Sequence, residues 1–534
     1  MGTPAPVSDR AAEPVRPATS RSDTAGPTTV GPGAGVLRRL LTGVWLWPAV
    51  LALALGLYGA GAPQLWEDEL NSWDMATRST GRLLDTIGHV DAVLGAYYLL
   101  LHGWTGLFGD SDLALRMPSV LAAAGAAVCT ALTGERLFGR RAGRVAGLLF
   151  ALVPVVSRYA QEARPYALVV LAVALATLLL LRALDRPDRR RRWGAYALAV
   201  TAVGLLHLVA LTALAGHAVA VATRAGPRGR AVAVRFGLAV LAGGTATAPL
   251  LVLGRSQAGR QISWIPRPDL WSLTAFWPEL FGSALVAGAL MALAVAAWGR
   301  RPEREEERDP DAPARSDASG RSLLVAVAVS ALAPPLVVWA VSHGEVSYFH
   351  FRYLLFTLPA WAVLAGAGLR HVRPRAVVGV LLAVLALLTL PEQRALREPY
   401  AHFWHGVDFQ GAAATIATYH RPGDAVVYDR GDDTWRLLDA GVRHYLPREL
   451  RPRDVFLARS AADRADLWPA ECPDPERCLR AEPRIWLVVP AGKADPLDAL
   501  PAAQARALRA RYRATGTERL TGVTVALLVR RAAS

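Results

Sequence analysis

The most constraining feature of this sequence is a series of long apolar segments that recur between about residues 40 and 390. Each segment is rich in Ala, Leu and Val, and most approach the roughly 20 residues that an α-helix needs to cross the hydrocarbon layer of a bilayer. Hydrophobic residues make up 53% of the chain, charged residues only 19%, and the mean hydropathy is +0.26. We therefore expect a multispanning α-helical membrane protein.

The apolar segments predict about eleven transmembrane helices. They lie near residues 41–60, 116–133, 144–157, 166–183, 194–207, 208–223, 236–253, 279–298, 323–341, 352–369 and 376–390. Several of these segments are shorter than a full crossing requires, so we expect the helices to extend beyond them or to bend.

The distribution of arginine predicts how the chain is oriented. The formal charge is +15, and the arginines gather in alternate loops, for example at 136–141, 186–192 and 370–375. The positive-inside tendency assigns these loops, and with them the N-terminus, to the cytoplasmic side of the cell membrane. An odd number of helices then places the C-terminal region outside the cell. Because orientation accounts for the positive charge and no basic surface interleaved with aromatics is seen, we expect no nucleic-acid partner.

Composition divides the chain into three parts. Residues 1–36 are rich in Pro, Ala, Thr and Gly and predict a disordered cytoplasmic tail. Residues 37–391 form the predicted transmembrane domain, in which residues 62–115 are a long first outer loop. Residues 392–534 have a mixed composition and predict a soluble domain outside the cell.

The soluble region shows the pattern of a small α/β domain. Short apolar runs at 425–428, 485–489 and 523–529 predict strands, and 408–419 and 496–512 predict helices. Cys472 and Cys478 lie in this region, where an extracytoplasmic location permits a disulfide; two free thiols are the alternative.

A dense acidic cluster, Glu67-Asp68-Glu69, follows the first apolar segment. Solvated carboxylates at a helix end cost little, so a simple cap is one interpretation. Three carboxylates next to an apolar helix equally suit the handling of a cation, a proton or a nucleophile. The cluster by itself supports both interpretations.

Three arginines stand at the predicted outer start of a helix: Arg116, Arg164 and Arg352. A helix N-terminus offers free N–H groups and a partial positive charge, so an arginine there favours an anion site. Arginines that only extend toward the membrane surface are the alternative. Aromatic residues near Trp264 and Tyr353 fit either an interfacial belt or a platform for a sugar.

Five short segments carry a resemblance to a known family. In chain order they are Asp68-Glu69, Tyr97-Tyr98, Leu115-Arg116-Met117-Pro118-Ser119, Gln161-Glu162-Ala163-Arg164-Pro165-Tyr166 and Arg352-Tyr353. Over about residues 40–390 this ordered set resembles the GT-C glycosyltransferases related to protein O-mannosyltransferases and the lipid A aminoarabinose transferase. More narrowly, it is similar to the family 39-like mannosyltransferases of actinobacteria. Relatives often carry a His-Pro-Pro-type segment before the paired tyrosines, whereas here Asp91 is followed by Ala-Val-Leu-Gly, which leaves the acceptor open.

The resemblance implies an inverting glycosyltransferase. It would move a sugar, mannose or another hexose or pentose, from a polyprenyl-phosphate donor to a lipid, glycan or protein acceptor at the outer face. Its phosphate leaving group is stable as an anion, so no general acid is required, unlike the paired carboxylates of glycosidases. Asp68 matches the family's catalytic aspartate and would accept the acceptor's proton, and Glu69 would orient it or hold an acceptor group.

The resemblance also implies which residues meet the substrates. Arg164 and Arg352, helped by Arg158, would neutralise the departing phosphate. Further substrate contacts would come from His89, Asp91, Tyr97, Tyr98, Gln161, Glu162 and Tyr166. The chemistry requires no cofactor. A divalent cation is left open because the first outer loop holds oxygen and nitrogen donors, although none has the spacing of a known metal motif.

Two other classes of protein share some of these features. A transporter or flippase of a lipid-linked sugar would also carry outer arginines, but transporters commonly place polar groups near the bilayer midplane. Here the midplane of most segments is Ala, Leu and Val. A receptor-like scaffold would explain the soluble domain but not the ordered segments of the outer loops.

Overall fold

The structure is a computed structural model that describes residues 1–3, 42–224, 229–299, 317–402, 406–431 and 434–532. From Val44 onward the chain forms one compact unit. The tail predicted at residues 1–36 lies almost wholly outside the described residues.

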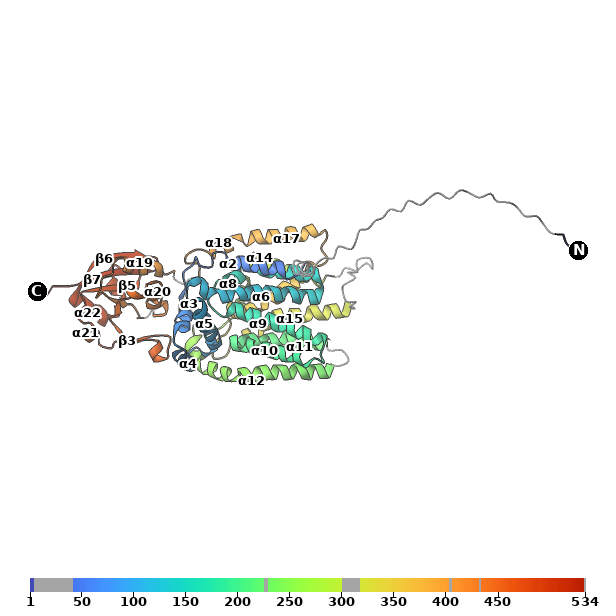
Figure 1. Ribbon diagram of the computed structural model, residues 1–534, viewed down its shortest axis with the longest axis horizontal. Coiled ribbons are helices and arrows are strands. Elements are labelled where there is room, and N and C mark those ends of the chain that lie inside the picture. The colour runs from blue at the N-terminus through green and yellow to red at the C-terminus, as the bar shows by residue number, and fades with distance from the viewer. Residues whose placement is uncertain (4–41, 225–228, 300–316, 403–405, 432–433, 533–534) are drawn as a thin grey trace, which may run out of the picture. The chain divides into compact units, whose positions relative to one another are not determined.

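Helices occupy every apolar segment in which the sequence predicts one, and Figure 1 shows many of them running side by side. They are α2 (Leu46–Leu57), α6 (Asp112–Phe138), α7 (Arg140–Leu152), α8 (Pro154–Ala160), α9 (Tyr166–Asp185), α10 (Arg190–Leu206), η2 (Leu208–Ala213), α11 (Leu214–Arg224), α12 (Gly229–Gln261), α13 (Leu270–Phe281), α14 (Ala284–Ala296), α15 (Asp317–Val341), η5 (Phe351–Thr357), α16 (Leu358–Gly368), α17 (Arg375–Leu388) and α18 (Leu390–Ala395).

Within the described residues, five helical segments are long and apolar enough to cross a membrane, or up to seven if each of two bent pairs counts as one span. The pairs are α7 with α8, bent by 65°, and α13 with α14, bent by 96°. Pro154 starts the second helix of one pair, and Gly282 ends the first helix of the other in the left-handed region at φ 72°. The other four predicted positions hold shorter helices: α2, α10, α11 and α17. A helical, multi-pass membrane protein is confirmed, whereas eleven crossings remain a prediction.

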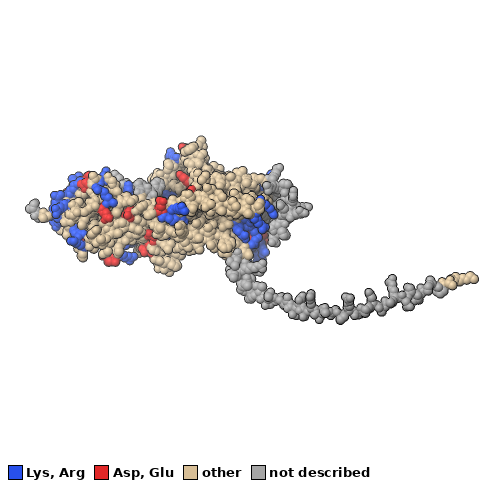
Figure 2. Space-filling view, turned by 90° about the horizontal axis from the view of Figure 1, so that it is seen from above, with Lys and Arg blue, Asp and Glu red and all other residues tan. Residues whose placement is uncertain are grey.

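The outer surface of the helices suits a hydrocarbon environment. On α12, for example, Leu238, Leu241 and Val252 are 61%, 61% and 73% exposed. Figure 2 shows a largely uncharged surface along the helices and a group of arginines at one end of them. Apolar side chains exposed in this number are favourable in contact with lipid and unfavourable in water.

The predicted outer loop at 62–115 is mostly helical rather than irregular. It contains α3 (Glu67–Thr77), α4 (Thr80–His89), η1 (Ala92–Leu94) and α5 (Gly95–Phe108). These helices bury residues such as Leu70, Met75 and Leu83 in one apolar cluster, which explains why the segment folds. The acidic cluster therefore begins a new helix, α3, and does not cap the first apolar segment.

The C-terminal region is built on a five-stranded sheet with the order β2-β1-β5-β7-β6. The strands are β1 (Ala425–Tyr428), β2 (Arg453–Asp454), β5 (Arg484–Pro490), β6 (Tyr512–Leu520) and β7 (Val523–Arg530). The first three strands of that order are parallel, and β7 and β6 complete the sheet in antiparallel pairs. A two-stranded ladder joins β3 (Leu457–Arg459) to β4 (Ala470–Glu471).

Helices cover both faces of this sheet. Alternate side chains of β1 point to opposite faces, so that Val426 packs with α19 (Phe409–Tyr419) and α20 (Leu438–Tyr445), and Val427 packs with α22 (Ala502–Arg511). The shorter pieces are η6 (Thr434–Arg436), η7 (Arg448–Leu450), η8 (Ala462–Arg464), α21 (Pro475–Cys478) and η9 (Pro496–Ala499). Cys472 and Cys478 form a disulfide next to α21, and Cys129 of α6 is a buried free thiol.

The sheet region packs directly on the helices of the first outer loop. The Tyr445 hydroxyl donates to Asp112 at 2.8 Å and accepts the Leu65 N–H at 2.8 Å. Arg443 pairs with Asp74 of α3 at 2.5 Å. Apolar residues from both regions share one buried cluster. The C-terminal region therefore helps to hold α3, and with it the acidic cluster, in place.

Candidate active site

Asp68 and two predicted phosphate-binding arginines come together from three separate segments. Asp68 is the second residue of α3, Arg164 lies in the turn between α8 and α9, and Arg352 is the second residue of η5. Nη1 of Arg352 donates to Oδ2 of Asp68 at 3.1 Å, and Nη2 of Arg164 lies 3.7 Å from the same oxygen. No hydrogen bond between described residues reaches Oδ1 of Asp68, so this oxygen is available to accept a proton.

The two arginines keep unused hydrogen-bonding capacity in a buried setting. Their side chains are 11% exposed for Arg164 and 9% for Arg352, while that of Asp68 is 27% exposed. The Nε–H groups of both arginines are buried without a hydrogen-bond partner among the described residues. Because an unpaired buried donor costs free energy, such groups indicate a site for an acceptor such as a phosphate oxygen.

The charges around Asp68 keep it ionised at neutral pH. Burial alone would raise the pKa of this carboxyl, but the positive charges of Arg164, Arg352 and Arg158 outweigh burial and lower the pKa below its usual value. Asp68 is therefore an ionised carboxylate at neutral pH, and its contacts with Arg164 and Arg352 stabilise that charge.

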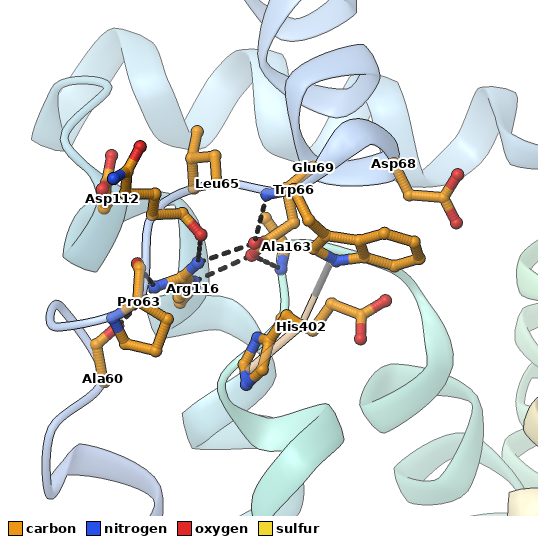
Figure 3. Close-up of polar contacts among 12 residues, drawn as sticks. Ala60, Pro63, Leu65, Trp66, Asp68, Glu69, Asp112, Arg116, Ala163 and His402 are labelled. Atoms are coloured by element: carbon orange, nitrogen blue, oxygen red, sulfur yellow. Dashed lines mark hydrogen bonds and ion pairs between the residues drawn. The ribbon is translucent and has the colours of Figure 1, made fainter. Parts of the chain in front are cut away.

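Glu69 faces away from Asp68, as Figure 3 shows. Its carboxylate accepts hydrogen bonds from Nε and Nη2 of Arg116 at 2.8 and 2.6 Å and from the Ala163 N–H at 2.7 Å. The side chains of Glu69 and Arg116 are both fully buried. The expectation that Glu69 orients the base or holds an acceptor group therefore does not fit its position, because consecutive helix residues point about 100° apart.

Arg116 was also expected to favour an anion site, but its surroundings do not suit one. It is the fifth residue of α6, and its guanidinium donates to Glu69 and to the carbonyls of Ala60, Pro63 and Gln64 at 2.7 to 3.1 Å. These contacts leave no donor for a ligand. Arg116 instead ties the start of α6 to the chain that leads into α3.

Arg158 and Glu162 form a second ion pair beside this cluster. Nη1 of Arg158 lies 2.5 Å from Glu162 and 3.1 Å from Nδ1 of His402, which follows α18. Burial raises the pKa of Glu162 to about 7, so its charge changes near neutral pH. The Arg158 guanidinium also lies over the rings of Trp66 and Tyr159. Arg158 thus acts on Asp68 through its charge and does not form an ion pair with it.

Aromatic rings surround the guanidinium of Arg352. Its Cζ lies 5.0 Å from the centroid of Trp264, 5.9 Å from Tyr166 and 6.0 Å from Tyr353. Tyr166 and Tyr353 are stacked with centroids 6.3 Å apart. Rings in these positions hold the cation by cation–π attraction and exclude water from one side of the site.

The segment around Asp91 borders the same region. Asp91 is buried, adopts a left-handed conformation at φ 59°, and accepts hydrogen bonds from the hydroxyl of Tyr98 and from Nε2 of Gln261. Burial raises the pKa of the Asp91 carboxyl, and Arg164 opposes this effect. Tyr97 is fully buried, and its hydroxyl has no hydrogen-bond partner among the described residues.

Two predicted contact residues have other surroundings. His89, at the end of α4, has a side chain that is 66% exposed and pairs with Asp85, so the structure does not bring it into the cluster. Gln161 is buried, and its Nε2 donates to the carbonyls of Leu55, Gly56 and Tyr58. Gln161 therefore fastens the turn before Arg164 to the end of α2.

Some site residues could not be found from sequence. His402, which contacts Arg158, lies far from it in the chain and carries no motif, so only the fold reveals this contact. For Trp264, the sequence indicated only an aromatic residue in an outer loop and not its contact with Arg352. For a metal, the described residues contain no group of three or more His, Cys, Asp or Glu side chains that could hold an ion.

Comparison with known proteins supports the resemblance seen in the sequence. Residues 94–246 match the family model described as dolichyl-phosphate-mannose-protein mannosyltransferase. No curated protein sequence gives a match.

Two solved structures of ArnT show that this fold is shared. ArnT from Cupriavidus metallidurans bound to undecaprenyl phosphate is 13% identical, with a TM-score of 0.59 over 90% of this chain and 97% of that one. Its apo state is 15% identical, with a TM-score of 0.60 over the same shares of the two chains, 90% and 97%. An apo oligosaccharyltransferase from Archaeoglobus fulgidus is 12% identical, with a TM-score of 0.45 over 90% of this chain and 74% of that one. The resemblance to the GT-C glycosyltransferases is confirmed.

Proposed function

We propose that this protein is an integral-membrane inverting glycosyltransferase that moves a sugar from a polyprenyl-phosphate donor to an acceptor at the outer face of the cell membrane. The single observation that carries the proposal is the convergence of Arg164 and Arg352 on one oxygen of Asp68, with a buried unpaired Nε–H on each arginine. The GT-C resemblance and the lipid phosphate bound by ArnT support the choice of donor. Mannose or another hexose or pentose is the sugar that we expect.

The charge of the site suits one phosphate group. Asp68, Arg164 and Arg352 together carry one net positive charge, which the single negative charge of a sugar phosphodiester would neutralise. Arg158 and Glu162 form a separate pair and add little net charge while both are ionised. An Arg–phosphate contact can be bidentate and charge-assisted, so the two buried Nε–H groups would gain the partners that they lack here.

The proposed reaction is a single displacement. The acceptor hydroxyl oxygen attacks the anomeric carbon, the bond from that carbon to the phosphate oxygen breaks, and the hydroxyl proton passes to Asp68. The leaving lipid phosphate gains one negative charge while Asp68 loses one. Arg164 and Arg352 can follow this shift because they contact the carboxylate and would contact the phosphate, which stabilises the charge where it develops.

Donor binding would also change the pKa of the proposed base, Asp68. With the arginines shared between Asp68 and a phosphate, less positive charge acts on the carboxylate, and its pKa should rise from its lowered value. A base whose pKa moves toward the working pH is more effective in proton transfer. Glu69 then has a supporting role, since its pair with Arg116 fixes the start of α3.

The test is transfer by the purified full chain in lipid vesicles, given a panel of radiolabelled polyprenyl-phosphate sugars and an envelope extract as the acceptor. We expect sugar released from the lipid by the wild type, and a fall in turnover of about 10²–10⁴-fold in Asp68→Asn while the donor still binds. Chelation of divalent cations should leave the wild type active. Near-normal turnover in Asp68→Asn would refute the base, and movement of intact donor across the bilayer would identify a transporter instead.

A further inference from the structure

A cavity of about 220 Å³ lies between the C-terminal sheet and α3. Tyr428 and Arg430, at and after the end of β1, line one side of it, and Asp439 and Arg443 of α20 line another. From α3, Asn71 and Asp74 complete the wall. None of the residues that the proposed transfer uses lines this cavity.

The cavity occupies a place where sheets of this kind bind ligands. In the sheet order, β1 lies between β2 and β5, and both pair with it in parallel. From the carboxyl end of β1 the chain passes through α20 to β2, which pairs with one edge of β1. It later forms β5, which pairs with the other edge of β1. Ligands of open α/β sheets bind in the crevice at such a switch point, outside the carboxyl ends of the strands.

The polar walls of the cavity are balanced in charge. The wall residue Arg430 has a side chain only 5% exposed and pairs with Asp439 at 2.9 Å and with Asp454 at 2.5 Å. It also lies 3.5 Å from Glu471, which does not line the cavity. Arg443 pairs with Asp74 at 2.5 Å. Arg451 also lines the cavity, so three arginines face three aspartates. A phosphate or another strong anion would find no net positive charge here.

Two of these buried groups keep unused hydrogen-bonding capacity. Nη1 of Arg430 lies 3.5 Å from Oε1 of Glu471 but, like Oδ1 of Asp454, is buried without a hydrogen-bond partner within the described ranges. One is a donor and the other an acceptor, which is the combination that a hydroxyl group satisfies. Leu437, Leu446 and Leu467 add apolar surface to the same cavity. Convergent polar groups on an apolar wall, with no net charge, are suited to an uncharged polyol.

We propose that this cavity binds a neutral sugar unit of the acceptor, which makes the acceptor a glycan. The inference rests on the proposed function, because it deepens the question of which acceptor is used. Asn71 and Asp74 follow Asp68 by three and six positions on α3, which corresponds to about 4.5 and 9 Å along the helix axis. A glycan held in the cavity would therefore lie within reach of the base through the same rigid helix.

The experiment measures binding to the purified full chain in detergent micelles. The ligands are neutral trisaccharides (mannotriose, maltotriose and cellotriose), a sialylated trisaccharide and inorganic phosphate. We expect at least one neutral trisaccharide to bind, and Asn71→Ala and Arg451→Ala each to weaken it by about tenfold, the effect of losing one or two hydrogen bonds. Arg477→Ala is the matched control, because Arg477 has an 86% exposed side chain and does not line the cavity.

Further measurements separate this proposal from the proposed function. Asp68→Asn should bind the trisaccharide like the wild type, so a failure of the transfer assay leaves the binding result intact. Far-ultraviolet circular dichroism and melting temperature report whether Asn71→Ala and Arg451→Ala are folded. Absence of neutral trisaccharide binding at millimolar concentration would overturn the proposal. So would preferential binding of phosphate or of the sialylated trisaccharide, or unchanged binding in both folded variants.

Discussion

Replacement of Glu69 by glutamine should destabilise the protein much more than its isosteric shape suggests. Glu69 and Arg116 are both fully buried, and the carboxylate accepts two hydrogen bonds from the guanidinium and one from the Ala163 N–H. Glutamine removes the negative charge and offers one acceptor oxygen, so the Arg116 cation would remain buried without compensation. Breaking a buried pair in this way costs about 3–5 kcal/mol.

Unfolding of these variants can be measured through the reactivity of the chain's own free cysteine. Cys129 in α6 is a buried free thiol, and the other two cysteines form a disulfide. A fluorogenic maleimide that labels Cys129 during denaturant titration in micelles therefore reports unfolding of the helical domain. The control is Asp185→Asn, since the Asp185 side chain is 38% exposed and pairs with Arg136, also 38% exposed, and at 3.7 Å with Arg224. An exposed pair of this kind contributes about 0–1 kcal/mol.

The double variant Glu69→Gln with Arg116→Met tests the reasoning further. It removes the uncompensated cation and should recover part of the lost stability. Recovery should be incomplete, because Arg116 also satisfies the carbonyls of Ala60, Pro63 and Gln64. If Glu69→Gln changes the free energy of unfolding by less than about 1 kcal/mol, like the exposed control, the buried pair does not have the role that we assign to it.

Three further predictions concern the acidic cluster and the arginines near it. Arg164→Ala and Arg352→Ala should each weaken donor binding by about 1.5–3 kcal/mol, measured by equilibrium binding of the lipid donor, and unchanged affinity in both would exclude the phosphate site. The acid limb of the kcat/KM profile should lie below the usual pKa of an aspartate, because the arginines lower the pKa of Asp68; a limb above pH 5 would contradict this. Burial raises the pKa of Glu67 from 4.5 to about 7, so the stability linked to its protonated form is complete below pH 4.5 and is lost as the pH rises through 7. In unfolding titrations, the free energy of unfolding of Glu67→Gln should therefore match that of the wild type near pH 4.5 and exceed it at pH 8 by about 3 kcal/mol. An equal difference between the two proteins at both pH values would refute the raised pKa of Glu67.

The sequence alone determined the features that depend on neighbouring residues. Each of the eleven apolar segments predicted as a helix holds one, and the short apolar runs predicted β1, β5 and β7 close to their observed bounds. The helices α3, α4 and α5 of the first outer loop were not predicted. The strand β6 was not predicted, because its residues from Arg513 to Arg519 are exposed and polar and show no apolar alternation. Asp68, Arg164 and Arg352 were identified from the ordered segments, and the fold brings them together.

Only the tertiary structure decided how neighbouring acidic residues divide their roles. Asp68 and Glu69 are adjacent and chemically similar, but the packing of α3 turns one toward the arginines and the other into a buried pair with Arg116. The same packing leaves His89 exposed and brings Asp112 to the C-terminal domain. Contacts of this kind join residues far apart in the chain. They depend on where helices bend and which faces meet, and no local pattern of residues specifies either.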